Sequence, residues 1–235
     1  MHDSVKPLKI IYNNAWNGRM RAPWTEFIKA QAADTDIFCF QEMYDDNFRA
    51  YCRQLLPDFR EYTDTKFLAE NNRFHQAIYV RPGVVVQHSA SLLSDQTDCG
   101  LALYLQIEHN GQLVSVCNVH GTALPVNKLD TPARIKQSSL ILDFFASLQG
   151  PTIIGGDFNL EPLTQSVAMF QERGYRNLIA DYTIATTRNH LVWDRHLKPQ
   201  LFADYMFTSP EVTVEDFTVL DNEISDHLPM VLIIR

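Results

Sequence analysis

The sequence predicts a layered α/β fold, in which β-sheets are covered by helices. Three observations lead to this prediction. Short apolar, β-branched or aromatic runs, which are typical of strands, recur along the whole chain. Helical patterns fall between several of these runs, and such a mixture implies sheets packed against helices. The hydrophobic fraction of 46% and the charged fraction of 20% match an ordinary globular protein and argue against a disordered chain or a coiled coil.

The expected strands are short apolar runs bounded by polar or turn-forming residues. They cover residues 8–12, 37–40, 77–80, 101–107, 113–118, 152–154, 204–207, 212–219 and 229–234. No internal repeat, low-complexity tract or Gly/Ser linker interrupts them. We therefore expect a single domain over residues 1–235.

The clearest helix is expected over residues 131–148. Thr131 is a good N-cap, and Pro132 suits the first turn. Apolar residues, among them Leu142 and Phe145, then recur at helical spacing. Three further helices are expected. The first covers residues 24–33 and is opened by Pro23. The second is capped by Asp45 or Asp46 and ends at Leu56, and the third is capped by Thr164 and ends at Gly174.

The chain carries a formal net charge of −8 and no basic stripe. Proteins that grip a long nucleic acid nonspecifically usually have such a stripe, because neutralising phosphates drives that binding. The acidic balance therefore argues against a tight grip on a long duplex. It suits a solvated acidic surface, and equally a group of acids that hold cations.

The cysteines indicate the compartment. All four lie in or beside apolar stretches, and no two have Cys-x-x-Cys spacing. We expect buried free thiols rather than zinc ligands, which suits a reducing compartment. The N-terminal residues lack the apolar stretch of a signal peptide, and no apolar run is long enough to span a bilayer. We therefore expect a cytoplasmic monomer without stable membrane association.

Polar side chains follow four of the expected strands. They are Asn13 and Asn14, Gln41 and Glu42, Asn118 and His120, and Asp157 and Asn159. A rigid sheet positions the loops at its strand ends, so these groups converge if the four strands end at one edge. Carboxylate and amide oxygens suit a hard cation such as Mg²⁺. Asn and Asp also form simple turns, so the repetition at four strand ends carries the argument.

The segment Gly156-Asp157-Phe158-Asn159 places an acid and an amide two residues apart. In a strand-like segment, residues at this spacing face the same side. One side chain then reaches a water or a metal while the other reaches the same phosphoryl group. A turn explains the same residues, so the spacing is moderately specific.

The segment Ser225-Asp226-His227 precedes the last expected strand, and Asp204 begins an earlier one. A carboxylate that accepts one imidazole N–H fixes the ring and raises its basicity. We therefore predict contact between Asp204 and His227. A surface turn is the alternative explanation of the second segment.

With these residues in place, the chain resembles the endonuclease/exonuclease/phosphatase superfamily, which includes DNA-repair nucleases, neutral sphingomyelinases, inositol polyphosphate phosphatases and deadenylases. The likeness is greatest to small bacterial members. The matching landmarks span almost the whole chain, and they are Asn13, Gln41-Glu42, Asn118-Val119-His120, Gly156-Asp157-Phe158-Asn159, Asp204-Tyr205 and Ser225-Asp226-His227. The resemblance implies a four-layer α/β sandwich, in which two mixed β-sheets pack face to face and helices lie outside. Because the sheets mix parallel and antiparallel strands, the fold can also be classed as α+β.

The resemblance also implies one bound Mg²⁺ or Mn²⁺ as the cofactor. Glu42 is the expected main ligand, with Asn13 and Asp226 nearby, directly or through water. The doubled asparagine departs from the family pattern, so either Asn13 or Asn14 faces the pocket. Asp157 is expected to orient or deprotonate the attacking water, and to contact a second metal when one is present.

The remaining landmarks imply roles toward the phosphoryl group. Asn159 and His120 are expected to hydrogen-bond its oxygens as charge builds. Asp204 orients His227, which either stabilises the transition state or acts as general base. In-line attack on a phosphoester needs an activated water and neutralisation of the equatorial oxygens, and these groups supply both.

The sequence therefore predicts a divalent-metal-dependent phosphoester hydrolase. The expected substrate is a phosphodiester: a nucleotide, a short nucleic acid or another small phosphorylated molecule. A phosphomonoesterase acting on a metabolite or lipid head group is the alternative, and a non-catalytic binding module is a further one. The basic residues that can receive an anionic substrate at the pocket are Arg73, Lys128, Arg134, Arg188 and Arg195. For Arg188, which is expected to contact phosphate, a solvated loop position is the competing interpretation.

Overall fold

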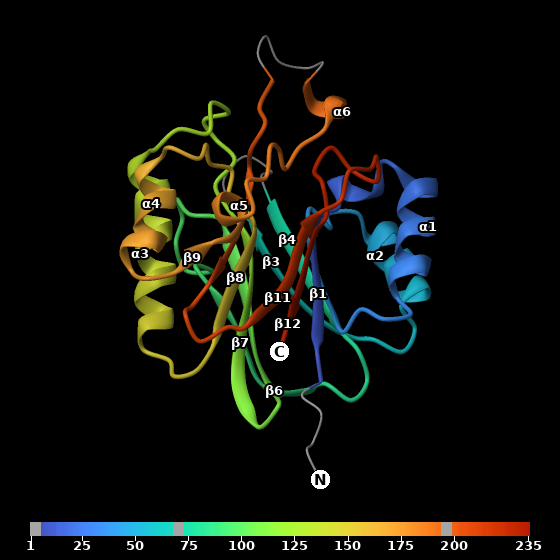
Figure 1. Cartoon of the computed structure of the whole chain (residues 1–235). Coiled ribbons are helices and arrows are strands. Elements are labelled where there is room, and N and C mark those ends of the chain that lie inside the picture. The colour runs from blue at the N-terminus through green and yellow to red at the C-terminus, as the bar shows by residue number, and fades with distance from the viewer. Residues whose placement is uncertain (1–5, 68–72, 194–198) are drawn as a thin grey trace.

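The computed structural model describes residues 6–67, 73–193 and 199–235 and has two mixed sheets at its centre (Figure 1). In the described residues the first sheet has six strands in the order β11-β12-β1-β2-β4-β3, and the second has six in the order β5-β6-β7-β8-β10-β9. The strands of the first sheet are β1 (Leu8–Asn14), β2 (Ile37–Gln41), β3 (Arg60–Phe67), β4 (Arg73–Val80), β11 (Val214–Val219) and β12 (Met230–Ile234). Those of the second are β5 (Val85–Leu92), β6 (Leu101–His109), β7 (Gln112–His120), β8 (Thr152–Asp157), β9 (Arg176–Asn177) and β10 (Asp204–Thr208).

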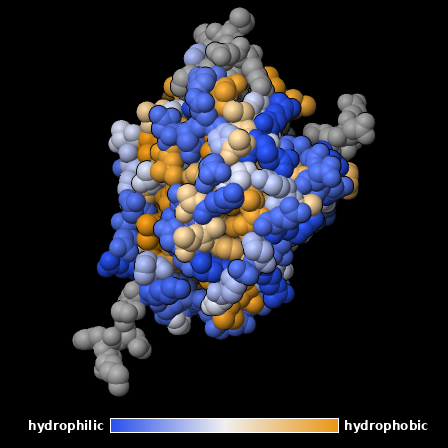
Figure 2. Space-filling model, turned by 90° about the vertical axis from the view of Figure 1, so that its right-hand side faces the viewer, coloured by the Kyte–Doolittle hydropathy of each residue, from blue (hydrophilic) through white to orange (hydrophobic). Residues whose placement is uncertain are grey.

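Helices form the two outer layers. Figure 1 shows α1 (Arg21–Gln31) and α2 (Asp46–Leu55) outside the first sheet, and α3 (Pro132–Ala146) and α4 (Gln165–Glu172) outside the second. Shorter helical turns complete the chain, namely η1 (Trp16–Gly18), α5 (Leu178–Asp181) and α6 (His190–Trp193). Hydrophilic residues cover much of the face on the side of α1 and α2 (Figure 2). The predicted four-layer sandwich is confirmed.

The alternation of side chains along the strands separates two cores. In β1, Ile10 and Tyr12 face the space between the sheets, whereas Ile11 faces the helices. Trp24 of α1 and Phe48 of α2 pack in that outer core, with ring centroids 5.6 Å apart. Each sheet therefore buries both faces, which explains why its central strands read as continuous apolar runs.

The predicted strands all form, and the structure adds β3, β5 and β9. β3 and β5 lie at sheet edges, and nearly all their residues are exposed or half-buried. Edge strands carry polar side chains because one side is open to solvent, so these segments lack the apolar run of a central strand. No described helix is both long enough and apolar enough to cross a membrane.

The predicted helix starts hold within a few residues. Asp45 caps α2 by accepting from the Phe48 amide, and Thr131 caps α3 by accepting from the Arg134 amide. Thr164 precedes α4 as predicted, but its side chain makes no cap bond. The carboxylate of Asp130 accepts the first amides of α4 instead, so a residue from another loop supplies the cap.

Asn118 of β7 ties the two sheets together across the inner core. Its amide donates to the backbone oxygens of Phe40 and Ala77 at 3.0 and 3.3 Å, and its Oδ1 accepts from Gln41 Nε2. The Asn118 carbonyl in turn accepts from Gln76 Nε2 at 2.9 Å. These polar atoms are fully buried, so each depends on its partner for satisfaction.

We predict that Asn118→Ala lowers the free energy of unfolding by about 3 kcal/mol, because it leaves several buried polar groups without partners. Urea unfolding followed by circular dichroism measures the change. Asn47→Ala, on the exposed face of α2, is the matched control and should stay within about 0.5 kcal/mol of wild type. Equal stability of the two variants would show that the tie is dispensable.

Candidate active site

The polar residues that follow the strands meet at one end of the sandwich, where Asn14 contacts both Glu42 and Asp157. β1 and β8 run toward the upper end in Figure 1. β1 pairs in parallel with β2, and β7 pairs in parallel with β8, so all four strands end there. β10 runs antiparallel to β8 and starts at this end, with Asp204 opposite Asp157. The predicted convergence of the strand ends is confirmed, and it combines residues from both sheets.

The carboxylate of Asp157 is the centre of this cluster and is 1% exposed. Its Oδ2 accepts from Asn14 Nδ2 at 2.9 Å, and its Oδ1 accepts from the Asn159 amide at 2.9 Å. The same Asn14 Nδ2 donates to Glu42 Oε1 at 3.1 Å. The Asn14 amide therefore bridges two carboxylates that come from different sheets.

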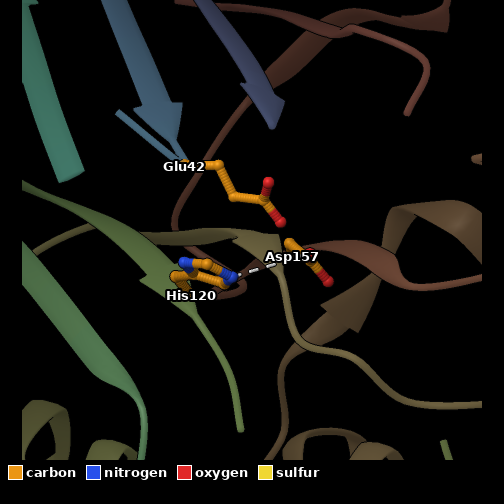
Figure 3. Close-up of side chains that lie close together, drawn as sticks. All are labelled: Glu42, His120 and Asp157. Atoms are coloured by element: carbon orange, nitrogen blue, oxygen red, sulfur yellow. Dashed lines mark ion pairs between the residues drawn. The ribbon is translucent and has the colours of Figure 1, made fainter. Parts of the chain in front are cut away.

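Glu42, His120 and Asp157 point toward one another (Figure 3), and one ligand atom of each lies within 4.8 Å of the others. Burial raises the pKa of Glu42, and the negative charge of Asp157 acts in the same direction. Burial opposes ionisation of Asp157 too, but His227, Lys128 and His120 hold its pKa below its usual range. Two close carboxylates with an imidazole form a site that a cation would stabilise.

His227 and Asp204 are in direct contact, as predicted. Nδ1 of His227 lies 3.0 and 2.9 Å from the two carboxylate oxygens of Asp204. Burial lowers the pKa of His227, but the charges of Asp204, Asp157 and Asp226 together outweigh it, and the net shift is upward. Nε2 of the same ring lies 3.7 Å from Asp157 Oδ2. The carboxylate thus fixes the ring with its second nitrogen directed at the cluster.

His120 differs from His227 in charge. It is 2% exposed, and burial lowers its pKa to about 4, so the ring is neutral at pH 7. Its Nε2 lies 3.9 Å from Asp157 Oδ2. The edge of the ring meets Phe74 at a centroid distance of 4.8 Å, and this aromatic neighbour had no signal in the sequence. The two histidines therefore present one neutral and one protonatable imidazole to the same carboxylate.

Asn159 reaches the cluster through a turn and not through strand alternation. β8 ends at Asp157, and Asn159 has a φ of 56°, in the left-handed region. Its backbone amide donates to Asp157 Oδ1, which closes the turn. The side-chain Nδ2 donates to the Gly121 carbonyl at 3.2 Å. The convergence was predicted, but the geometrical reason given for it was wrong.

The structure separates the two asparagines that the sequence left open. Asn14 contacts Glu42 and Asp157, as described above. Asn13 donates from Nδ2 to the His227 carbonyl at 3.1 Å, and its buried Oδ1 has no partner among the described residues. Both therefore position the site, but only Asn14 touches its carboxylates.

Arg188 and Asp226 form a buried ion pair, with Nη2 and Oδ2 at 3.1 Å and both residues 5% exposed. This burial excludes the solvated-loop interpretation of Arg188. Its Nη1 donates to Gln200 Oε1 at 3.2 Å, and its backbone pairs with that of His227. Asp226 helps to raise the pKa of Glu42, so the pair borders the carboxylate cluster.

The other basic residues have different places. Arg73 is exposed at the start of β4 and donates to the Tyr44 carbonyl. Arg134 is fully buried and binds backbone carbonyls, so its expected contact with substrate is not supported. Lys128 lies in the site, with Nζ 2.5 Å from Asn159 Oδ1. Arg195 lies outside the described residues.

Tyr44 is a neighbour of the site that the sequence did not reveal. Burial raises the pKa of its hydroxyl, and the charges of Glu42 and Asp157 raise it further. The only sequence signal was its position two residues after Glu42. Apolar and aromatic residues are frequent throughout the chain, so that position was not distinctive.

Solved structures with this fold are similar over nearly their full length. A family protein from Bacteroides thetaiotaomicron aligns with a TM-score of 0.74 and 20% identity, covering 98% of each chain. A mannosyl-6-phosphatase of the same species aligns at 0.71 and 19%, covering 96% of this chain and 98% of that one. The catalytic domain of human nocturnin aligns at 0.69 and 19%, covering 97% and 93%.

These identities are low, and the structural likeness establishes the fold. Among curated protein sequences, no match is found. The model of the Endonuclease/Exonuclease/phosphatase family, however, matches residues 14–227, from Asn14 at the end of β1 to His227 before β12. Members of this family hydrolyse phosphoesters and generally use divalent metals, and the cluster of Glu42, His120 and Asp157 suits such an ion. The chain therefore belongs to the endonuclease/exonuclease/phosphatase family.

Proposed function

We propose that this protein is a Mg²⁺- or Mn²⁺-dependent phosphoester hydrolase that acts by in-line attack of water on a phosphoryl group. The observation that carries the proposal is the cluster of half-buried Glu42 with buried Asp157 and His120, whose ligand atoms lie within 4.8 Å of one another. His227, held by Asp204, borders the same cluster. These are the groups that phosphoester hydrolysis needs, gathered from both sheets.

The residues of the cluster fit a hard divalent cation. Glu42 and Asp157 supply carboxylate oxygens, which Mg²⁺ and Mn²⁺ prefer, and their mutual repulsion is relieved by a positive ion. We propose Glu42 as the main ligand, with Asp226 and Asn14, whose amide contacts Glu42 and Asp157, as neighbouring groups. When bound, the cation neutralises charge on the phosphoryl oxygens.

The side chains divide the remaining work. Asp157, which stays ionised, orients the attacking water and can take its proton. The neutral His120 and the amide of Asn159 donate hydrogen bonds to the phosphoryl oxygens as charge develops on them. The Asp204 carboxylate holds His227 in place, and the protonated ring then stabilises the transition state.

Two arginines extend the site toward substrate. Arg188 lies beside the cluster and keeps a buried Nε that has no partner among the described residues. It is therefore proposed to bind a phosphate oxygen while its Nη2 stays paired with Asp226. Arg73 is exposed at the rim and is proposed to attract the anionic substrate.

We propose a small phosphodiester, such as a nucleotide or a short nucleic acid, as the substrate. The net charge of −8 disfavours a firm grip on a long duplex. A phosphomonoester of a small metabolite or lipid head group is the second candidate, because a similar fold is found in a mannosyl-6-phosphatase. The nocturnin catalytic domain binds a sulfate anion, which is consistent with an anion site in this fold.

We further propose that the protein acts in the cytoplasm as a monomer without stable membrane association. All four cysteines are free and buried, as suits a reducing compartment. Size-exclusion chromatography with light scattering checks the oligomeric state.

The first test of function is hydrolysis of bis-p-nitrophenyl phosphate and p-nitrophenyl phosphate. We expect turnover with Mg²⁺ or Mn²⁺ and its loss in EDTA. Asp157→Asn and His227→Ala should each lower kcat by about 10²–10³, because each removes a group that the proposed chemical step uses. The exposed Asp216→Asn and His88→Ala are the matched controls and should retain wild-type rates. A folded protein that hydrolyses neither ester, nor any nucleic acid or phospholipid, would favour a binding module.

The second test concerns the metal itself. Mn²⁺ should raise the thermal unfolding midpoint of the wild-type protein, because it binds only the folded cluster. Glu42→Gln should abolish most of this rise, since it removes a charged ligand from the cluster. Glu172→Gln, on the exposed face of α4, should keep it. An unchanged Mn²⁺ response in Glu42→Gln would refute Glu42 as the main ligand.

A further inference from the structure

Lys128 is a buried ammonium whose hydrogen bonds are incomplete. It is 5% exposed, and its Nζ donates to Asn159 Oδ1 at 2.5 Å. Among the described residues, Nζ has no other acceptor, and no carboxylate lies within 4 Å of it. An ammonium carries three donors, so two of them lack partners in the part of the chain that the structure describes. Burying such a group is costly unless a ligand satisfies it.

A second buried lysine shows what a structural role looks like in this protein. Lys66 at the end of β3 is 6% exposed, and its Nζ donates to the backbone oxygens of Leu93, Cys99 and Gly100. All three of its donors are used, and they tie β3 to the loop before β6. Lys128 is equally buried but has one such bond, so a purely structural role leaves its remaining donors unexplained.

The loop between β7 and α3 is built to hold Lys128 in place. Arg134 donates to four backbone oxygens of this loop, those of Thr122, Ala123, Pro125 and Leu129. The Lys128 carbonyl accepts from the Glu161 amide at 2.8 Å, which fixes the loop to the segment after β8. Lys128 itself has a φ of 56°, a left-handed conformation that costs a residue with a Cβ about 1 kcal/mol or more. Arg134 is therefore a positioning residue for the loop.

The ammonium belongs to the same electrostatic environment as the carboxylate cluster. Lys128 helps to hold the pKa of Asp157 low. Burial lowers the pKa of Lys128 itself, and the charges of Asp157 and Asp204 oppose that shift. Its hydrogen bond also fixes the amide of Asn159, because the donor Nζ binds only the Oδ1 side. Nδ2 of Asn159 then has one N–H on the Gly121 carbonyl, and its second N–H has no acceptor among the residues that the structure describes.

We propose that Lys128 binds a non-bridging oxygen of the substrate's phosphoryl group through its free N–H donors and orients Asn159 toward the same group. This inference rests on the proposed hydrolysis of phosphoesters. It adds a second cationic contact to the phosphoryl group, besides the one proposed for Arg188. A phosphoryl oxygen satisfies both the charge and the donors that the protein leaves open.

The test uses Lys128→Met, which keeps the length of the side chain and removes its charge. Isothermal titration with inorganic phosphate, with and without Mg²⁺, should show an affinity at least about 10-fold weaker than wild type. With bis-p-nitrophenyl phosphate, kcat/KM should fall about 10²-fold. The unfolding midpoint should be equal or higher, since the variant buries no unpaired ammonium. Lys136→Met, at an exposed lysine of α3, is the control for charge and should match wild type in all three measurements.

Lys66→Met is the control for a structural lysine and should lower the unfolding midpoint without weakening phosphate binding below that temperature. If Lys128→Met binds phosphate and hydrolyses the ester like wild type, the proposal is overturned. It is also overturned if Lys128→Met and Lys128→Gln are both destabilised as Lys66→Met is, with phosphate affinity unchanged. A wild-type protein that hydrolyses no ester would refute the proposed function, and the phosphate titration would still decide the role of Lys128.

Discussion

The buried negative charge of Asp157 is the constraint on which the site depends. A carboxylate at 1% exposure must be compensated, and it is surrounded by donors and cations from every nearby segment: Asn14 from β1, His120 from β7, Lys128 from the following loop and His227 before β12. His227 is held in turn by Asp204. The cluster is therefore assembled by folding, before any ligand arrives, and its atoms need little rearrangement during a reaction.

The second requirement is that the two sheets keep a fixed relation, since each supplies half of the cluster. Glu42 follows β2 of one sheet, and Asp157 ends β8 of the other. Asn118 of β7, the strand beside β8, bonds across the inner core to β2 and β4. Hydrogen bonds are directional and apolar packing is not. The bonds of Asn118 therefore constrain the register of the two sheets as well as their contact. The apolar core supplies most of the stability, whereas the tie determines which strand ends meet.

The layers of the fold and the polar residues at the strand ends could be predicted from the sequence, because apolar runs and the polar residues after them are local patterns. The contact between Asp204 and His227 followed from chemistry, since a buried imidazole needs an acceptor. The polar edge strand β5 escaped prediction because half-exposed strands lack an apolar run. The turn at Asn159, and the burial of Lys128, depend on loops whose paths only tertiary contacts determine.

The way in which Arg134 holds the loop between β7 and α3 has a consequence for how this protein can change. The guanidinium binds backbone oxygens, and these are the same whatever side chains the loop carries. Leu124, Val126 and Leu129 are accordingly exposed at 62%, 60% and 53% and contribute little to the core. Mutations at these positions can accumulate without unfolding the loop. The surface on either side of Lys128 in the chain can thus change while the backbone that positions this lysine stays in place.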